Sequence, residues 1–147
     1  MAPRRRPRIL SPRGLPDALV LDAGALSAAA GGEASVRAEL GLAEQLGVEV
    51  HVSSVTLAET LRGHLRDARL HAVLAGMAKD PVSPELGRRA GELLGRSRRD
   101  DTVDAIVAVS AEALGARVRL LTGDPSDLRA LTSSMSNVTV VPIGGRR

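Results

Sequence analysis

The 147-residue sequence contains no cysteine, phenylalanine, tyrosine or tryptophan. Without cysteine, the chain cannot form disulfides, zinc–thiolate sites or a thiol nucleophile. Without aromatic residues, it lacks the stacking platforms on which single-strand binders usually hold bases. Any contact with a nucleic acid would therefore rest on arginine, the backbone and bound metal.

Long apolar segments are missing as well. No apolar run reaches the length of about 18 residues that a membrane span requires. The basic start of the chain is followed by prolines and Asp17, whereas a signal peptide would continue into an apolar core. The sequence therefore predicts a soluble, cytoplasmic protein, and its length suits one packed domain.

Lysine is nearly absent, because Lys79 is the one lysine among the 20 cationic residues. Arginine binds phosphate through two parallel hydrogen bonds and stays charged, so this composition is compatible with a nucleic-acid partner. A genome rich in G and C would also favour arginine codons, and composition alone does not separate the two explanations.

The two ends of the chain differ from its middle. Residues 1–17 hold four prolines and five arginines with little apolar content, which is typical of a disordered basic tail. Residues 18–143 are predicted to form the folded domain. Residues 144–147 then form a second, short basic tail.

Strand and helix patterns alternate through residues 18–143. Short apolar or alternating runs predict strands at 18–21, 48–52, 118–122 and 138–143. Helical spacing of apolar residues predicts helices at about 36–46, 55–75, 84–95, 101–114 and 125–131. This alternation favours an α/β fold in which helices cover both faces of a central parallel sheet of about four to five strands.

Acidic residues recur where such a sheet places its ligands, beyond the carboxyl ends of the strands. Asp22 directly follows the first strand, and Asp124 follows the strand at 118–122. Glu59 and Asp104 lie near the starts of helices that would follow the same edge. Four carboxylates could therefore face one cleft.

A cluster of this kind needs a counterion. Two negative charges about 5 Å apart repel by roughly 3 kcal/mol at an effective dielectric of about 20. Carboxylates without histidine or thiol suit a hard cation, Mg²⁺ or Mn²⁺. Such an ion can activate water and orient a phosphodiester, so the cluster indicates phosphodiester hydrolysis.

Each acid also fits an ordinary role at a helix end. Asp22 could cap the first helix, and Asp124 precedes a proline as an N-cap often does. Asp104 could be a capping-box acid, and Glu59 could pair with Arg62 on the surface. The recurrence of all four acids at one edge favours a single site.

Other polar residues are weaker candidates. Asp101 and Asp127 are interpreted as an N-cap and as a solvated helix residue. Thr122, at a strand end, could bond a carboxylate or a metal-bound water, although a buried strand residue needs no function. The histidines show no metal-ligand spacing and are interpreted as surface or packing residues; they are His51, His64 and His71.

Four segments in this order resemble the PIN-domain family, in particular the VapC-type ribonuclease toxins. They are LVLDAGAL at 19–26, VSSVTLAETLRG at 52–63, DTVDAIVA at 101–108 and LLTGDPSDL at 120–128. The resemblance covers about residues 18–143 and implies a PIN-like fold. It places the family's acids on Asp22, Glu59, Asp104 and Asp124 and its strand-end hydroxyl on Thr122. We expect the metal on Asp22 and Asp104.

The resemblance implies an Mg²⁺-dependent endoribonuclease, with Mn²⁺ as a substitute, acting on structured RNA such as tRNA or ribosomal RNA. It also implies a homodimer and a small antitoxin protein that covers the site. Ala23 departs from the family pattern, in which Thr or Ser often follows the first acid. A PIN-like scaffold that binds RNA or a partner without cutting remains an alternative. A receiver-type signalling domain is disfavoured, since it would need a lysine near the end of a late strand.

Overall fold

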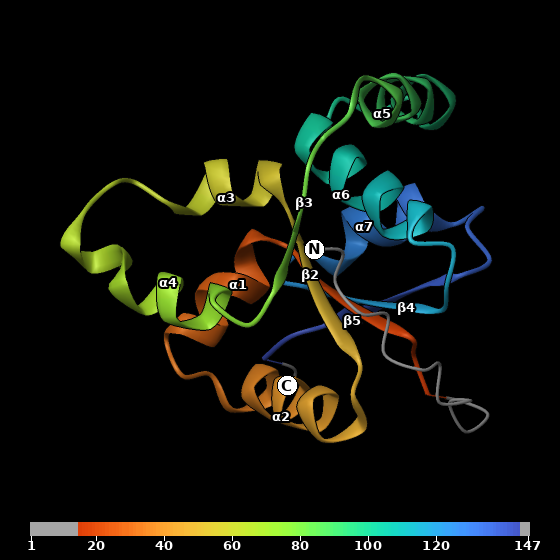
Figure 1. Cartoon of the computed structure of the whole chain (residues 1–147). Helices are drawn as coiled ribbons and strands as arrows, with labels where there is room; N and C mark the ends of the chain where they lie inside the picture. Colours follow the sequence, from red (N-terminus) through yellow and green to blue (C-terminus); the bar gives the residue numbers. More distant parts are fainter. Residues whose placement is uncertain (1–14, 145–147) are drawn as a thin grey trace, which may run out of the picture.

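The computed structural model describes residues 15–144 (Figure 1). In these residues a five-stranded sheet is surrounded by helices. The strands are β1 Ala18–Leu21, β2 Glu49–Ser53, β3 Ala78–Asp80, β4 Val118–Thr122 and β5 Val138–Pro142. The helices are α1 Ala23–Ala30, α2 Ala34–Leu46, α3 Ser54–Thr60, the 3-10 turn η1 Leu65–Asp67, α4 Ala68–Leu74, α5 Pro84–Ser97, α6 Thr102–Ala113 and α7 Pro125–Thr132.

All strand pairs are parallel, and the order across the sheet is β3-β2-β1-β4-β5. The central strand β1 aligns Leu19 with Val50 of β2 and with Arg119 of β4. Because every strand runs in the same direction, all their carboxyl ends meet at one edge. The predicted α/β fold with a parallel sheet is confirmed.

Alternate residues of β1 face two separate cores, as the period of a strand requires. Ala18 and Val20 pack into the core beneath α5, α6 and α7. Leu19 and Leu21 pack into the core on the other face, beneath α1, α2 and α4. All four residues are buried, which explains why this strand is a continuous apolar run.

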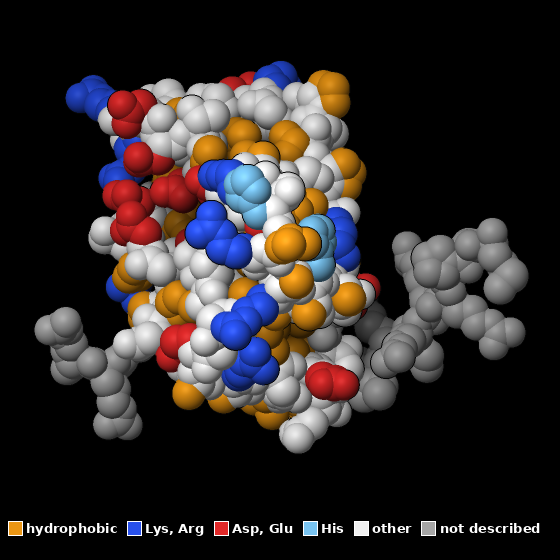
Figure 2. Space-filling view, turned by 90° about the vertical axis from the view of Figure 1, so that its left-hand side faces the viewer, with side chains coloured by type: hydrophobic (Ala, Val, Ile, Leu, Met, Phe, Trp, Pro, Cys, Tyr) orange, Lys and Arg blue, Asp and Glu red, His pale blue; other side chains and the backbone are white. Residues whose placement is uncertain are grey.

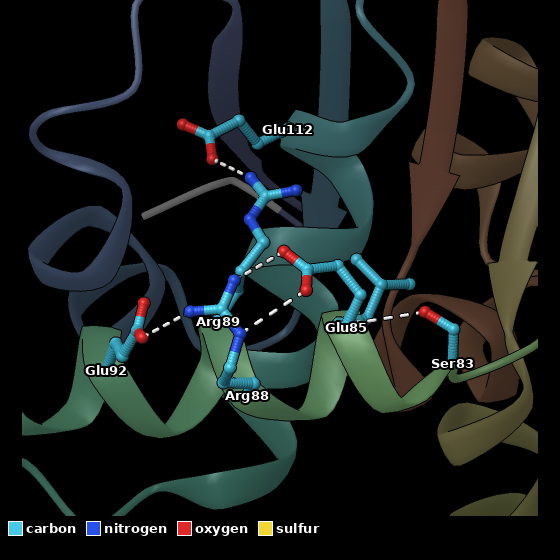
Figure 3. A network of polar contacts seen from close by, with 7 residues as sticks. Ser83, Glu85, Arg88, Arg89, Glu92 and Glu112 are labelled. Carbon is cyan, nitrogen blue, oxygen red and sulfur yellow. Dashed lines mark hydrogen bonds and ion pairs between the residues drawn. The ribbon is translucent and has the colours of Figure 1, made fainter.

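A polar network joins α5 to α6 on the outside of one layer (Figure 3). Ser83 caps α5 by accepting a hydrogen bond from the backbone N–H of Leu86 at 3.1 Å. Arg89 then reaches across to Glu112 of α6, with 2.5 Å between nitrogen and oxygen. This ion pair joins α6, which carries Asp104, to α5, which packs against α6.

The predicted helix over residues 55–75 is wrong, because the chain turns inside it. Helix α3 ends at Thr60, and Gly63 adopts a left-handed φ of 74°. The buried carboxylate of Asp67 accepts the backbone N–H groups of Arg62 and Gly63, both at 2.8 Å. These bonds replace helical ones, and α4 starts only at Ala68.

Two further differences concern short segments. Strand β3 was not predicted, since its three residues include the charged Lys79 and Asp80. Helix α5 was predicted to stop at Gly95, yet it continues to Ser97 and ends where Arg98 adopts a φ of 54°.

The predicted basic tails lie largely outside the described residues, which exclude 1–14 and 145–147. At the start of the described part, the backbone N–H of Asp17 donates to the carbonyl of Arg117 at 2.8 Å. Among the described helices, none combines the length and apolar character that crossing a membrane requires.

Candidate metal-binding carboxylate site

Asp22 lies where β1 passes into α1, and its buried carboxylate is held from two sides. One oxygen, Oδ1, accepts the backbone N–H of Ala25 at 2.9 Å. The other, Oδ2, accepts a hydrogen bond from the hydroxyl of Thr122 at the end of β4. Asp22 is therefore the helix cap that the sequence allowed, and it is also oriented by a second strand.

The turns after β1 and β4 touch each other. The hydroxyl of Thr122 accepts the backbone N–H of Asp124 at 2.8 Å while it donates to Asp22. A Cβ added to Gly24 would lie 3.2 Å from the Cα of Gly123, closer than ordinary contact. Glycine at these positions thus lets the turns that carry Asp22 and Asp124 approach each other.

Asp124 occupies the N-cap position of α7, where the sequence allowed a purely structural role. Its side chain makes no capping hydrogen bond to that helix. Its oxygen Oδ1 instead accepts the hydroxyl of Ser126 at 3.4 Å. Capping therefore does not account for this carboxylate.

Asp104 is the half-buried acid in the first turn of α6. Burial raises the pKa of its carboxyl to about 6, and the negative charges of the neighbouring acids add to this shift. In order of effect these neighbours are Asp22, Asp101, Asp124 and Asp127. These acids lie on α6 and α7 and on the residues that directly precede α1, α6 and α7.

Glu59 lies near the end of α3, which packs between α1 and α6. Partial burial and then the charge of Asp22 raise the pKa of Glu59, while Arg62 lowers it. The guanidinium of Arg62 donates to the carbonyls of Ala58 and Leu61. Within residues 15–144 no ion pair joins it to Glu59, so the surface pair that the sequence allowed is not formed. Glu59 lies at the rim of the carboxylate group around Asp22.

Asp101 and Asp127 lie inside the cluster, which the sequence interpretation had not favoured. One carboxylate oxygen from each of Asp101, Asp104 and Asp127 lies within 4.8 Å of the others. Asp101 occupies the N-cap position of α6 without making a capping bond. The spacing of three between Asp101 and Asp104 could have indicated this, since such residues share one helix face. No local pattern connects Asp127 to them.

Arg99 is the cation of this cluster within the described residues. Its guanidinium lies 3.2 Å from Asp101 and also pairs with Asp127. No hydrogen bond or ion pair of the Asp104 side chain occurs within residues 15–144, although acids surround it. A group of carboxylates of which one lacks a cation fits Mg²⁺ or Mn²⁺, both of which prefer oxygen ligands.

The histidines lie outside this cluster. His51 is buried on β2, where its Nδ1 lies 2.9 Å from a carboxylate oxygen of Asp80 on β3. His64 and His71 are exposed.

Several solved structures share this fold at low sequence identity. VapBC2 from Rickettsia felis, bound to a DNA fragment from its promoter, matches with a TM-score of 0.66 and 18% identity over 84% of this chain and 97% of that chain. A toxin–antitoxin complex from Klebsiella pneumoniae matches with a TM-score of 0.64 and 18% identity over 83% and 96%. VapBC-5 from Mycobacterium tuberculosis matches with a TM-score of 0.56 and 22% identity over 87% and 100%.

Sequence comparison identifies the family. No curated protein sequence matches the chain. The family model of the PIN domain, however, matches residues 19–132. This match begins within β1 and ends with α7, so it contains every acid of the cluster described above. The chain belongs to the PIN domain family.

Proposed function

We propose that this chain is a divalent-metal-dependent endoribonuclease and the toxin of a bacterial toxin–antitoxin pair. One observation carries the proposal: Asp104 lies among acids whose charges, together with its own burial, raise its pKa to about 6. Perturbed pKa values of this kind cluster at functional sites, and a divalent cation bound among these acids would offset their repulsion. Membership of the PIN domain family and the likeness to solved toxin–antitoxin structures support the proposal.

Asp22 and Asp104 are the proposed ligands of Mg²⁺, for which Mn²⁺ can substitute. When bound, the ion would supply an activated water and neutralise charge on the phosphodiester. The protein's part is to hold Asp22 still, through the Thr122 hydroxyl and the N–H of Ala25. A side chain that is already held in place loses less conformational entropy when it binds the metal, and this raises the affinity for the metal.

The remaining acids have proposed roles around this pair. The raised pKa of Glu59 makes its carboxylate a better proton acceptor than an ordinary glutamate. Glu59 is therefore the proposed acceptor of a proton from the attacking water. Asp124 adds negative charge beside Asp104 and strengthens the field that attracts the cation.

We further propose two protein contacts. A small cognate antitoxin would bind the chain and cover the carboxylate site, and two copies of the chain would form a homodimer. Sedimentation of the purified chain tests the dimer. Co-expression with the product of an adjacent small reading frame tests the antitoxin, because that product should suppress RNA cleavage.

The nuclease proposal is tested by incubating the purified chain with total RNA and Mg²⁺, next to Asp104→Asn. Asp100→Asn is the matched control, because Asp100 is exposed and does not contribute to the pKa shift of Asp104. Wild type and control should release discrete RNA fragments, and Asp104→Asn and an EDTA-treated sample should not. Induced expression of wild type and of Asp100→Asn should arrest growth, and induced expression of Asp104→Asn should not. Intact RNA in every sample would leave a non-catalytic binding module as the better description.

A further inference from the structure

The arginines of the described residues fall into two groups. One group forms ion pairs with acids and comprises Arg88, Arg89, Arg99, Arg117 and Arg119. For the other group no ion pair is found within residues 15–144; it comprises Arg37, Arg62, Arg66, Arg69, Arg96, Arg98 and Arg129. Three of these lie within the short stretch from position 62 to 69, where α3 passes into α4.

Arg62, Arg66 and Arg69 are all exposed, and we refer to them as the arginine arc. The guanidinium groups of Arg66 and Arg69 have no hydrogen-bond partner within residues 15–144. The one acid in the stretch, Asp67, is buried, and its carboxylate accepts backbone N–H groups. These bonds lower the pKa of Asp67, and the bond from the N–H of Arg62 has the largest effect. Asp67 therefore stays ionised while it braces the loop. The arc thus carries positive charge that no acid within residues 15–144 pairs, on the turn that Asp67 braces and on the first turn of α4.

The arc adjoins the carboxylate site. Arg62 follows Glu59 by less than one helical turn, and its charge lowers the pKa of Glu59. Figure 2 shows Lys or Arg side chains and histidine side chains over the middle of this face, and a group of acidic side chains at its upper left border. The stretch 60–71 also contributes two exposed histidines, His64 and His71.

A hollow of about 580 Å³ continues the surface beyond the arc. Arg69 of α4 and Arg37 of α2 both line it, together with Gly31, Gly32 and one acid, Glu44. Neither arginine is paired with an acid within residues 15–144. Cationic side chains therefore extend from the rim of the carboxylate site to a depression between α2 and α4.

We propose that the arginine arc binds the sugar–phosphate backbone of an RNA strand next to the phosphodiester that is cut. This inference rests on the proposed nuclease function. A polyanion that approaches a cluster of carboxylates is repelled, and nearby unpaired guanidinium groups offset that repulsion. Because the chain has no Phe, Tyr or Trp, the rings on which such proteins usually stack bases cannot supply the affinity. The contact is made to phosphates, so it does not depend on base sequence.

The test measures binding of the full chain to a labelled single-stranded RNA of about 20 nucleotides, longer than a typical binding site. EDTA is present, so cleavage does not interfere. The variant is Arg66→Gln with Arg69→Gln, since neither guanidinium group has a hydrogen bond or ion pair within residues 15–144. The matched control is Arg88→Gln with Arg117→Gln, which removes the same charge from exposed arginines on α5 and before β4. Thermal melting verifies that both double variants are folded.

The arc variant should bind RNA about tenfold more weakly than wild type, because each exposed ion pair contributes a factor of roughly two to five. Its log–log dependence of affinity on salt should be shallower by about 1.4, because each arginine that no longer neutralises a phosphate of a single strand lowers the slope by about 0.7. The control should stay within about twofold of wild type, as surface charges away from the bound strand have little effect. With Mg²⁺, the arc variant should show a raised KM and an unchanged kcat.

Equal RNA affinity in the arc and control variants would overturn the inference. So would loss of binding to a polyglutamate peptide with unchanged RNA affinity, which would assign the arc to an acidic polypeptide. The outcome is separable from that of the nuclease proposal. RNA binding that depends on the arc, without cleavage at any metal concentration, would preserve the arc and reject the nuclease. If RNA is cleaved and the arc and control variants behave alike, the nuclease proposal stands and the role of the arc is rejected.

Discussion

The hydroxyl of Thr122 donates a hydrogen bond to Oδ2 of Asp22, one hundred positions earlier in the chain. The same hydroxyl oxygen accepts the backbone N–H of Asp124 at 2.8 Å. The buried side chain of Thr122 therefore orients the carboxylate of Asp22 and also holds the turn that carries Asp124.

Thr122→Val should weaken metal binding while leaving every acid in place. The change keeps the side-chain shape and removes the hydroxyl, so we expect a loss of about 1–2 kcal/mol in unfolding free energy. Loss of a group that orients a ligand should also lower Mg²⁺ affinity about tenfold or more. Thr132→Val is the control, because its buried hydroxyl bonds the carbonyl of Leu128. Calorimetric titration that found equal Mg²⁺ affinity in both variants would argue against a positioning role for Thr122.

The metal-free protein should lose stability as the pH rises from about 4 to 6. The folded state raises the pKa of Asp104 to about 6, above an unfolded value of about 3.9. The native state then binds more protons than the unfolded state within this window, so unfolding free energy falls with rising pH. Above pH 6 this contribution stays lost.

Urea denaturation of wild type and Asp104→Asn in EDTA isolates this effect. The variant should lack the decline between pH 4 and 6 and should be more stable than wild type at pH 7.5. Millimolar Mg²⁺ should raise the melting temperature of wild type and leave that of the variant unchanged. Identical pH profiles would show that Asp104 does not titrate in this range.

Arg99→Gln should destabilise the metal-free protein and enlarge the effect of Mg²⁺. The guanidinium partly neutralises Asp101 and Asp127, and its removal leaves both acids facing Asp104. We expect a loss of about 1 kcal/mol without metal, the scale of a partly exposed ion pair. The rise in melting temperature with Mg²⁺ should exceed that of wild type.

Arg89→Gln is the matched control for that change, since the pair of Arg89 with Glu112 is similarly exposed and joins α5 to α6. It should lower the melting temperature by a comparable amount and respond to Mg²⁺ as wild type does. An enlarged Mg²⁺ effect in both variants would mean that general destabilisation, and not the cluster charge, is responsible.

Thr56→Val should stabilise the protein. The hydroxyl of Thr56 is fully buried and has no hydrogen-bond partner in the described part of the chain. Replacing an unpaired buried hydroxyl by a methyl group should raise the unfolding free energy by about 1 kcal/mol. In Thr60→Val, by contrast, a hydroxyl that bonds the carbonyl of Thr56 at 2.9 Å is lost, and no gain is expected. A lower denaturation midpoint for Thr56→Val would reveal a partner for the hydroxyl.

Local patterns were sufficient where one segment carried the whole signal. Strand β4 was predicted with its observed bounds, Val118–Thr122, because its apolar residues Val118, Leu120 and Leu121 are all buried. The stop of α2 at Gly47 was likewise readable, since that residue adopts a left-handed φ of 67°. The break between α3 and α4 could not be predicted in this way. The carboxylate of Asp67 stabilises it by accepting backbone N–H groups, and the apolar spacing of the segment does not record such bonds.

The sequence by itself determined the layers of this protein and the edge of the sheet at which Asp22 and Asp124 had to lie. It did so because apolar periodicity records which faces are buried, and parallel strands place their carboxyl ends together. Only the tertiary structure decided that Asp127 joins Asp101 and Asp104, and that Arg99 bridges two of these acids. Those contacts depend on how α6 and α7 pack against each other, and a charge on an exposed helix face has no local pattern that reveals its distant partner.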